Sequence, residues 1–182
     1  MKRLLVVIDY QKDFVDGTLG FEKSTTLENG IYDKVNKYLQ NGDKVLFTYD
    51  THSEDYLKTR EGKNLPVTHC IEGSEGHKLY GKLEEFVGGK NTVHYKKYGF
   101  GLSPEDMINL ASEIGNDIEE IEIVGVVTNI CVVSNMVMFQ SQYRNAEIIV
   151  DGSLCGSFDD LLHEKTLDVI EGLQGKVINR GN

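Results

Sequence analysis

The chain has 182 residues, of which 40% are hydrophobic and 26% are charged, and its formal net charge at neutral pH is −10. This length and balance predict one globular domain, residues 1–182, with a substantial buried core. The negative charge argues against nucleic acid or an anionic membrane surface as a partner.

The N-terminus and the cysteines indicate the compartment. Residues 1–9 begin like a signal peptide but reach Asp9 after only five apolar residues, so they predict a strand and not a leader. No apolar run in the sequence is long enough to span a membrane. Cys70, Cys131 and Cys155 are an odd number without zinc-ribbon spacing, which is typical of a reducing compartment. We therefore predict a cytoplasmic protein.

Residues 4–8 form a continuous apolar run, which predicts a strand buried on both faces. Asp9 follows this strand, at the end where open α/β sheets bind their ligands, so it could take part in a functional site. An acid at this position is equally expected to cap the next turn. After a loop to residue 20, Ser24 or Thr25 can cap a helix that continues to about residue 40.

Residues 44–49 predict a second strand, which again ends at an acid, Asp50. The segment 50–76 is long and polar, and such a connection in a compact domain is usually functional or disordered. Its carboxylates and histidines could form an N/O metal site, whereas solvated loop charges are the commoner outcome for such residues. Asp50 and His52 favour ligation, because residues two apart on an extended chain point to the same side.

Residues 77–87 predict a short helix, and residues 92–97 predict a third strand that ends at Lys97. Ser103-Pro104 is a strong helix start, because Pro suits the first helical position and acids follow in the first turn. The buried face expected of this helix is Met107, Leu110, Ala111 and Ile114.

The stretch 121–132 is the one around which the chain is organised. Its β-branched apolar run, followed by Gly125, Thr128 as a good N-cap and a long apolar segment, predicts a buried strand, a tight turn and a buried helix. Cys131 falls in the first turn of that helix, where the macrodipole and the unpaired N–H groups favour a thiolate and could bind an oxyanion. A cysteine within an apolar run is, however, usually a packing residue.

Residues 146–150 predict a fifth strand, and residues 158–173 predict a last helix. The apolar set expected of this helix is Leu161, Leu162, Leu167, Val169 and Ile170. Residues 176–178 could add a short edge strand. The alternation of strands and helices predicts a three-layer α/β/α fold around a central, mostly parallel sheet of five to six strands.

Three motifs in this order together resemble the isochorismatase-like cysteine hydrolases, the group that contains the nicotinamidases. Residues 7–19 read VIDYQKDFVDGTL, close to the family pattern VIDxQxDFxxGxL, and residues 125–132 read GVVTNICV, close to GxxTxxCV. Between them, Lys97 precedes the aromatic-small pair Phe100-Gly101. The likeness covers nearly the whole chain. It implies the isochorismatase-like hydrolase fold and a homo-oligomer, a dimer or a tetramer.

The resemblance implies a catalytic triad of Asp9, Lys97 and Cys131. Cys131 would attack an amide, Asp9 would act as the base, and Lys97 would hold the thiolate–carboxylate pair in register. Lys97 matches the family spacing because it lies three residues before Phe100, and Lys96 is the alternative.

The resemblance further implies a cis peptide bond between Val126 and Val127, and an oxyanion hole formed by the N–H groups of Val127 and Cys131. Family members that stack nicotinamide often use a Trp, and this chain has none. The aromatic wall would then come from Phe14 together with Tyr98 or Phe100. The side chains expected to bind substrate are Phe14, Leu19 and Phe100.

Nicotinamidases add a metal site next to the triad, formed by an Asp-x-His and a later His before a Cys. Asp50, His52 and His69 match that pattern, and Glu61 has the offset of a further carboxylate ligand found in some members. The ligand set implies a divalent metal, with zinc expected first and iron or manganese as alternatives. Such a metal would orient the pyridine nitrogen of a heteroaromatic amide.

The predicted function is therefore hydrolysis of a small-molecule amide through a thioester on Cys131, with nicotinamide as the expected substrate. One alternative is a metal-free cysteine amidase of the same fold that acts on a carbamoyl or ureido compound. Another is a protein of a different class, either a non-catalytic binding protein or a redox-thiol protein. A binding protein would be expected to lose one of the three triad residues, and no resolving cysteine lies near Cys131 in the sequence.

Overall fold

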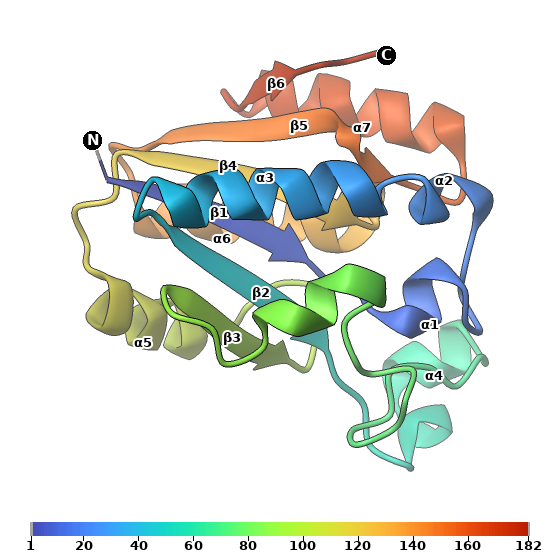
Figure 1. Ribbon diagram of the computed structural model, residues 1–182. Helices are drawn as coiled ribbons and strands as arrows, with labels where there is room; N and C mark the ends of the chain where they lie inside the picture. The colour runs from blue at the N-terminus through green and yellow to red at the C-terminus, as the bar shows by residue number, and fades with distance from the viewer. Residues whose placement is uncertain (1, 182) are drawn as a thin grey trace.

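The structure is a computed structural model that describes residues 2–181. Within these residues, six strands form one parallel sheet in the order β3-β2-β1-β4-β5-β6 (Figure 1). Their bounds are β1 Arg3–Ile8, β2 Lys44–Asp50, β3 Thr92–Lys97, β4 Glu120–Val126, β5 Glu147–Gly156 and β6 Lys176–Ile178. The predicted α/β class with a mostly parallel central sheet is therefore confirmed.

Helices cover both faces of the sheet and give the three predicted layers (Figure 1). One face packs against α3 (Glu28–Gln40) and the 3-10 helix η2 (Gly81–Phe86). The other packs against α5 (Pro104–Ile114), α6 (Val133–Gln142) and α7 (Asp160–Gly172). The shorter helical segments are α1 Lys12–Val15, α2 Glu22–Thr25, the 3-10 helix η1 Tyr56–Lys58, α4 Arg60–Asn64 and the π-helix η3 Thr128–Val132.

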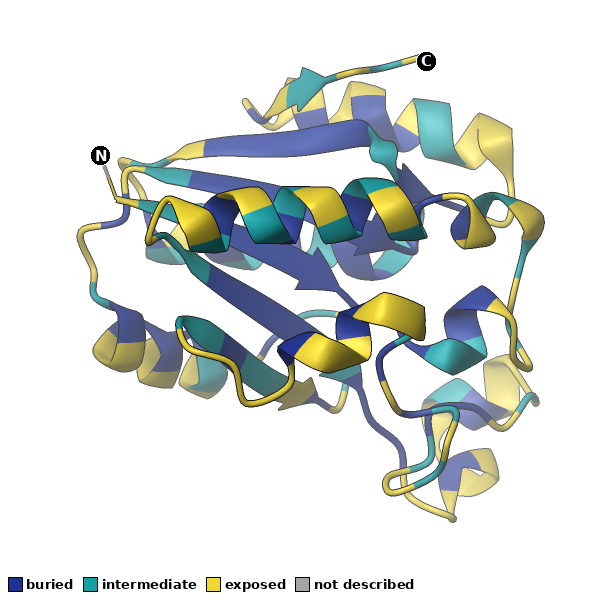
Figure 2. Ribbon diagram, in the orientation of Figure 1, coloured by how far each residue is buried: buried dark blue, intermediate teal, exposed yellow. Residues whose placement is uncertain are grey.

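The central strands are buried because their side chains alternate between the two helical layers. In β1, Leu4, Val6 and Ile8 belong to the core beneath α5, α6 and α7, while Leu5 and Val7 belong to the core beneath α3. Figure 2 shows the same burial along the neighbouring strands. A strand covered on both faces needs an apolar side chain at every position, which explains the continuous apolar run.

The strand order creates a switch point between β1 and β4. Strand β2 lies on one side of β1 and strand β4 lies on the other. In open α/β sheets, ligands bind in the crevice beyond the carboxyl ends of the two strands at such a point, here β1 and β4. Gly125, near the end of β4, has a φ of 115°, and a Cβ at this position would collide with the carbonyl oxygen of Ile8. Only glycine allows β4 to approach β1 this closely.

Two predicted helix starts are wrong. The helix predicted over 24–40 is two helices, because α2 ends at Thr25 and α3 begins at Glu28. The Ser24 and Thr25 hydroxyls donate to backbone carbonyls of the α2 turn, so they do not cap α3. Thr128 does not cap the helix after β4 either, because it is already the first residue of η3.

The remaining differences concern the lengths and faces of elements. Strand β5 continues to Gly156, past the predicted end at residue 150, because it goes on pairing with β4. Of the segment 77–87 only η2 is helical, and the predicted loop before residue 20 contains α1. In α7, Leu167 and Ile170 are buried, but Leu161, Leu162 and Val169 are exposed. Among residues 2–181, every helix is too short or too polar to cross a lipid bilayer.

Candidate active site

Three ionisable side chains meet at the carboxyl edge of the sheet. Asp9 directly follows β1, Lys97 is the last residue of β3, and Cys131 lies in η3 after β4. Lys97 Nζ is 2.7 Å from Asp9 Oδ2 and 3.5 Å from Cys131 Sγ, and all three side chains are buried. The fold thus brings together the three residues predicted as a triad, although they are far apart in the sequence.

Lys97 and its neighbour Lys96 have opposite environments, because successive side chains of a strand point to opposite faces. Lys97 is fully buried, and its Nζ also contacts Asp50 Oδ1 and the carbonyl oxygen of Gly99, both at 3.1 Å. Lys96 is exposed and pairs with Glu72. Lys97 is therefore the lysine that lies in the site.

Asp9 is held in the left-handed region of backbone space, with a φ of 44°, which non-glycine residues rarely adopt. The Thr48 hydroxyl on β2 donates to Asp9 Oδ1 at 2.7 Å and accepts from the Asp9 N–H at 3.2 Å. The other oxygen, Oδ2, forms an ion pair with Lys97 Nζ at 2.7 Å. A carboxylate oxygen has two lone pairs, so Oδ2 can still take up a proton while it is paired with the lysine.

Burial dominates the acid–base properties of Asp9 and Cys131. It raises the pKa of the Asp9 carboxyl and holds the pKa of the Cys131 thiol well above its usual value, although the charge of Lys97 opposes both shifts. Burial alone would lower the pKa of Lys97, but the charges of Asp9, Cys131 and Asp50 outweigh it and raise that pKa. Both shifts oppose the stabilisation of a thiolate that the helix start alone would give.

The turn between β4 and α6 has the local features that the resemblance implies. The peptide bond between Val126 and Val127 is cis. Val127 and Cys131 line the same pocket, described below. The Thr128 hydroxyl is hydrogen-bonded to Nδ1 of His163 at 2.8 Å, which fixes the turn to α7.

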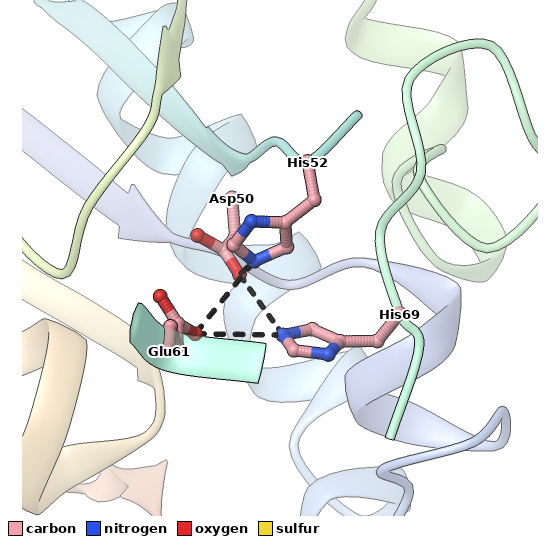
Figure 3. Close-up of side chains that lie close together, drawn as sticks. All are labelled: Asp50, His52, Glu61 and His69. Atoms are coloured by element: carbon pink, nitrogen blue, oxygen red, sulfur yellow. Dashed lines mark hydrogen bonds and ion pairs between the residues drawn. The ribbon is translucent and has the colours of Figure 1, made fainter. Parts of the chain in front are cut away.

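Beside the triad, Asp50, His52, Glu61 and His69 point toward one another (Figure 3). Asp50 Oδ2 lies 3.0 Å from His52 Nε2 and 3.4 Å from His69 Nε2, and Glu61 Oε1 lies 3.7 Å and 3.9 Å from the same two nitrogens. Donors about 2.0–2.1 Å from a tetrahedral zinc would lie about 3.3 Å from each other. The four donors therefore fit a divalent metal in both chemistry and spacing.

Contacts around this cluster orient its ligands. His69 Nδ1 is 2.7 Å from the carbonyl oxygen of Val67 and donates to it, which leaves Nε2 as the free acceptor. Gln11 holds the Asp50 backbone from both sides: its Oε1 accepts from the Asp50 N–H and its Nε2 donates to the Asp50 carbonyl. Burial alone would raise the pKa of Asp50, but Lys97, His52 and His69 outweigh it and keep that pKa below its usual value.

A narrow, mainly apolar pocket leads to Cys131 and has a volume of about 40 Å³. It is lined by Phe14, Leu19, Asp50, Glu61, Leu65, His69, Phe100, Val127, Ile130, Cys131 and Phe158. This set includes the three side chains predicted to bind substrate.

Sequence reasoning missed Leu65, Ile130 and Phe158 as wall residues. Ile130 lies within the nucleophile motif and Phe158 closely follows the end of β5, so nearness to a strand end was a usable signal for both. Leu65 lies in a polar segment, and an isolated apolar side chain in such a segment was the signal that it could line the pocket.

A parallel α/β sheet with a buried thiol, acid and lysine at its carboxyl edge defines a hydrolytic enzyme of the α/β class. The sequence profile of the isochorismatase domain matches residues 3–181, nearly the whole chain. The protein therefore belongs to the isochorismatase family.

Individual relatives agree with this assignment. The curated "Uncharacterized isochorismatase family protein PncA" of Bacillus subtilis (strain 168) is 30% identical over 170 residues, which cover 90% of this chain and 91% of that protein. The crystal structure of nicotinamidase/pyrazinamidase PncA from Bacillus subtilis is similar with a TM-score of 0.86 and 27% identity, over 98% of this chain and 100% of that one. The predicted enzyme class, an amidohydrolase, is confirmed by the family and these relatives.

A zinc complex of Pyrococcus horikoshii pyrazinamidase is similar with a TM-score of 0.83 over 98% of this chain and 99% of that one. Its identity of 19% shows a shared fold alone.

Proposed function

We propose that this enzyme hydrolyses nicotinamide to nicotinate and ammonia. The observation that carries the proposal is the position of the buried Asp9–Lys97–Cys131 group, at the base of an aromatic pocket that also reaches Asp50, Glu61 and His69. The similarity to a Bacillus subtilis nicotinamidase/pyrazinamidase supports the same substrate class.

In the first half of the proposed reaction, Cys131 Sγ attacks the carboxamide carbon. The thiol proton moves to Asp9 Oδ2, the oxygen paired with Lys97, which also contacts Cys131 Sγ. The N–H groups of Val127 and Cys131 bind the oxyanion of the tetrahedral intermediate. Asp9 then returns the proton to the leaving nitrogen, the C–N bond breaks, and ammonia leaves a thioester on Cys131.

In the second half, Asp9 takes a proton from a water molecule that attacks the thioester carbon. The C–S bond breaks, the proton on Asp9 moves to Cys131 Sγ, and the acid that is released gives its remaining proton to solvent and becomes nicotinate. Lys97 stays positively charged throughout both halves of the reaction. Its charge stabilises whichever neighbour is negative at that stage, the Asp9 carboxylate or the Cys131 sulfur.

Asp50, His52, Glu61 and His69 would hold a divalent metal, with zinc first and iron or manganese as alternatives. Bound there, the ion would supply a Lewis acid for the pyridine nitrogen of the substrate. The wall residues Phe14, Leu19 and Phe100 would hold the ring so that its carboxamide faces Cys131.

The same proposal includes one domain over residues 1–182, a cytoplasmic location and a homo-oligomer. A single sheet shared by all the strands among residues 2–181 supports one domain. Unpaired Cys70, Cys131 and Cys155 agree with a reducing compartment. The dimer or tetramer stays a prediction from the family resemblance.

The test is ammonia release from nicotinamide by the purified protein, compared with Cys131→Ala. Cys155→Ala is the matched control, because Cys155 is equally buried but lies within β5, away from the pocket. Activity in the wild type and in Cys155→Ala, but not in Cys131→Ala, supports the proposal. A folded, metal-loaded wild type that releases no ammonia removes nicotinamide as the substrate. Carbamoyl and ureido amides would then be assayed, because a metal-free cysteine amidase is the alternative that uses the same triad.

A further inference from the structure

Asn135 in α6 makes three hydrogen bonds that the proposed reaction does not use. Its side chain is fully buried. Nδ2 donates to the carbonyl oxygens of Cys131 at 2.8 Å and Phe100 at 3.0 Å, and Oδ1 accepts from the Leu102 N–H at 3.0 Å. Both amide hydrogens and the acceptor oxygen are therefore satisfied by two different parts of the chain. One side chain ties the nucleophile turn to the loop 99–102.

That loop contributes two groups to the site. The Gly99 carbonyl oxygen accepts from Lys97 Nζ, and the Phe100 side chain lines the substrate pocket. Within residues 2–181, the hydrogen bonds that join this loop to the rest of the chain come from Lys97 and Asn135 alone.

The packing beneath the loop is close as well. A Cβ placed on Gly101 would meet Met138 Cγ and the Ser134 carbonyl oxygen at 3.4 Å, so the loop lies directly on α6. Phe100 itself is 45% exposed, so its own burial does little to hold it. Its position relative to Cys131 depends on its backbone, which is held by the bonds to Asn135, by the packing of Gly101 and by the buried Leu102 side chain.

We propose that Asn135 is a positioning residue that sets the distance between the Phe100 wall and the Cys131 nucleophile, and thereby the size of amide that the pocket accepts. The inference rests on the proposed function for the role of Cys131 as nucleophile. It adds a determinant of substrate binding that the triad and the metal cluster do not provide.

The first test is hydrogen exchange, which needs no substrate. Asn135→Ala removes the acceptor of the Leu102 N–H, so the Leu102 amide should exchange at least about tenfold faster while the amides of β4 keep their protection. Asn135→Leu fills the same volume without the bonds and serves if the alanine variant does not fold. The control is Ser141→Ala, which also loses a side-chain bond to the carbonyl four residues earlier on α6, but at the exposed end of the helix.

The second test is kinetic. For the amide that the wild type hydrolyses, Asn135→Ala should raise KM by about tenfold and change kcat by less than about threefold, because loss of ground-state positioning affects binding first. In a double-mutant cycle with Phe100→Ala, the KM of the double variant should equal that of Phe100→Ala alone, since Asn135 acts through that side chain. Ser141→Ala should match the wild type.

Faster loop exchange with a raised KM and a non-additive cycle establishes the inference. Unchanged loop exchange overturns it, and so does an additive cycle or a fall in kcat at constant KM. Failure of the proposed function is visible separately, because the wild type and Cys131→Ala would then be equally inactive toward nicotinamide and the other amides. The exchange experiment would still decide whether Asn135 fastens the loop.

Discussion

Burying a charged lysine costs desolvation free energy. A lysine enclosed by two carboxylates stays charged only because its attraction to both of them offsets that cost. Lys97 is in this situation between Asp9 and Asp50, at 2.7 Å and 3.1 Å. Replacing it would leave two buried carboxylates facing each other, and the pKa of Asp9 would rise further because Lys97 lowers it and Asp50 raises it.

We therefore expect Lys97→Met to lower kcat/KM for amide hydrolysis by about 10²- to 10⁴-fold, the usual range for a group that governs proton transfer. Lys96→Met is the matched control, because that exposed side chain pairs with Glu72 on the surface, and its activity should stay within about twofold of the wild type. Steady-state kinetics on both variants provides the measurement. Wild-type activity in Lys97→Met would contradict the assigned role.

At the scale of elements, the close approach of β1 and β4 depends on Gly125. A Cβ there would collide with the Ile8 carbonyl oxygen, and the φ of 115° disfavours any other residue. Gly125→Ala should lower the free energy of unfolding by more than about 2 kcal/mol. Gly172→Ala, at the end of α7 with open space around its Cα, should be neutral or slightly stabilising. Urea unfolding compares them, and equal stability of both variants would refute the packing argument.

The segment that follows β2 supplies three of the four side chains that converge beside Asp9, Lys97 and Cys131, with Glu61 on the short helix α4 and His52 and His69 on either side of it. Short helices and loops gain order from what they bind. We expect wild-type protein prepared without chelator to contain close to one equivalent of divalent metal, and His52→Ala to contain less than about a tenth of that. Elemental analysis measures both. His94→Ala is the control, because His94 lies on β3 and contacts Tyr49 and Thr92 instead. A metal-free wild type would favour the carbamoyl or ureido alternative.

At the scale of the whole molecule, a buried ion network joins α3, the sheet and the C-terminal segment. Lys34 pairs with Glu122 on β4 and, at 2.6 Å, with Asp151 on β5, and Asn179 donates to Asp151 at 3.0 Å. Burial alone would raise the pKa of Asp151, but the bonds from Lys34, Ser153 and Asn179 outweigh it and lower that pKa below its ordinary value of 3.8.

A carboxyl with a lower pKa in the folded chain than in the unfolded chain stabilises the fold fully above the unfolded value, and this stability is lost as the pH falls through the folded value. Asp151→Asn should therefore cost about 2 kcal/mol of unfolding free energy near neutral pH. The difference from the wild type should shrink below pH 3.8. Urea unfolding at several pH values tests this, and a difference that stays constant with pH would contradict it.

How much the sequence reveals depends on whether a feature is local. Asp9, Cys131 and the strands that carry them were predictable, because a buried parallel strand and a strand-to-helix turn each leave a continuous pattern. The bonds of Thr48 and Asn135 join elements that are distant in the sequence, so no local pattern indicates them. The exposed Leu161 and Leu162 misled the prediction of the buried face of α7, because an apolar side chain on a helix is compatible with either side.

Asp9, Lys97 and Cys131 come from the ends of sheet strands or the turn directly after one, whereas much of the pocket wall comes from loops, through Leu19, Leu65, Phe100 and Phe158. The two groups of residues are consequently free to diverge at different rates during evolution, since a loop can change without rebuilding the sheet. Related proteins with this scaffold are therefore expected to conserve the chemical reaction more strongly than the substrate. Family membership constrains the reaction of this enzyme, and its wall residues constrain what it recognises.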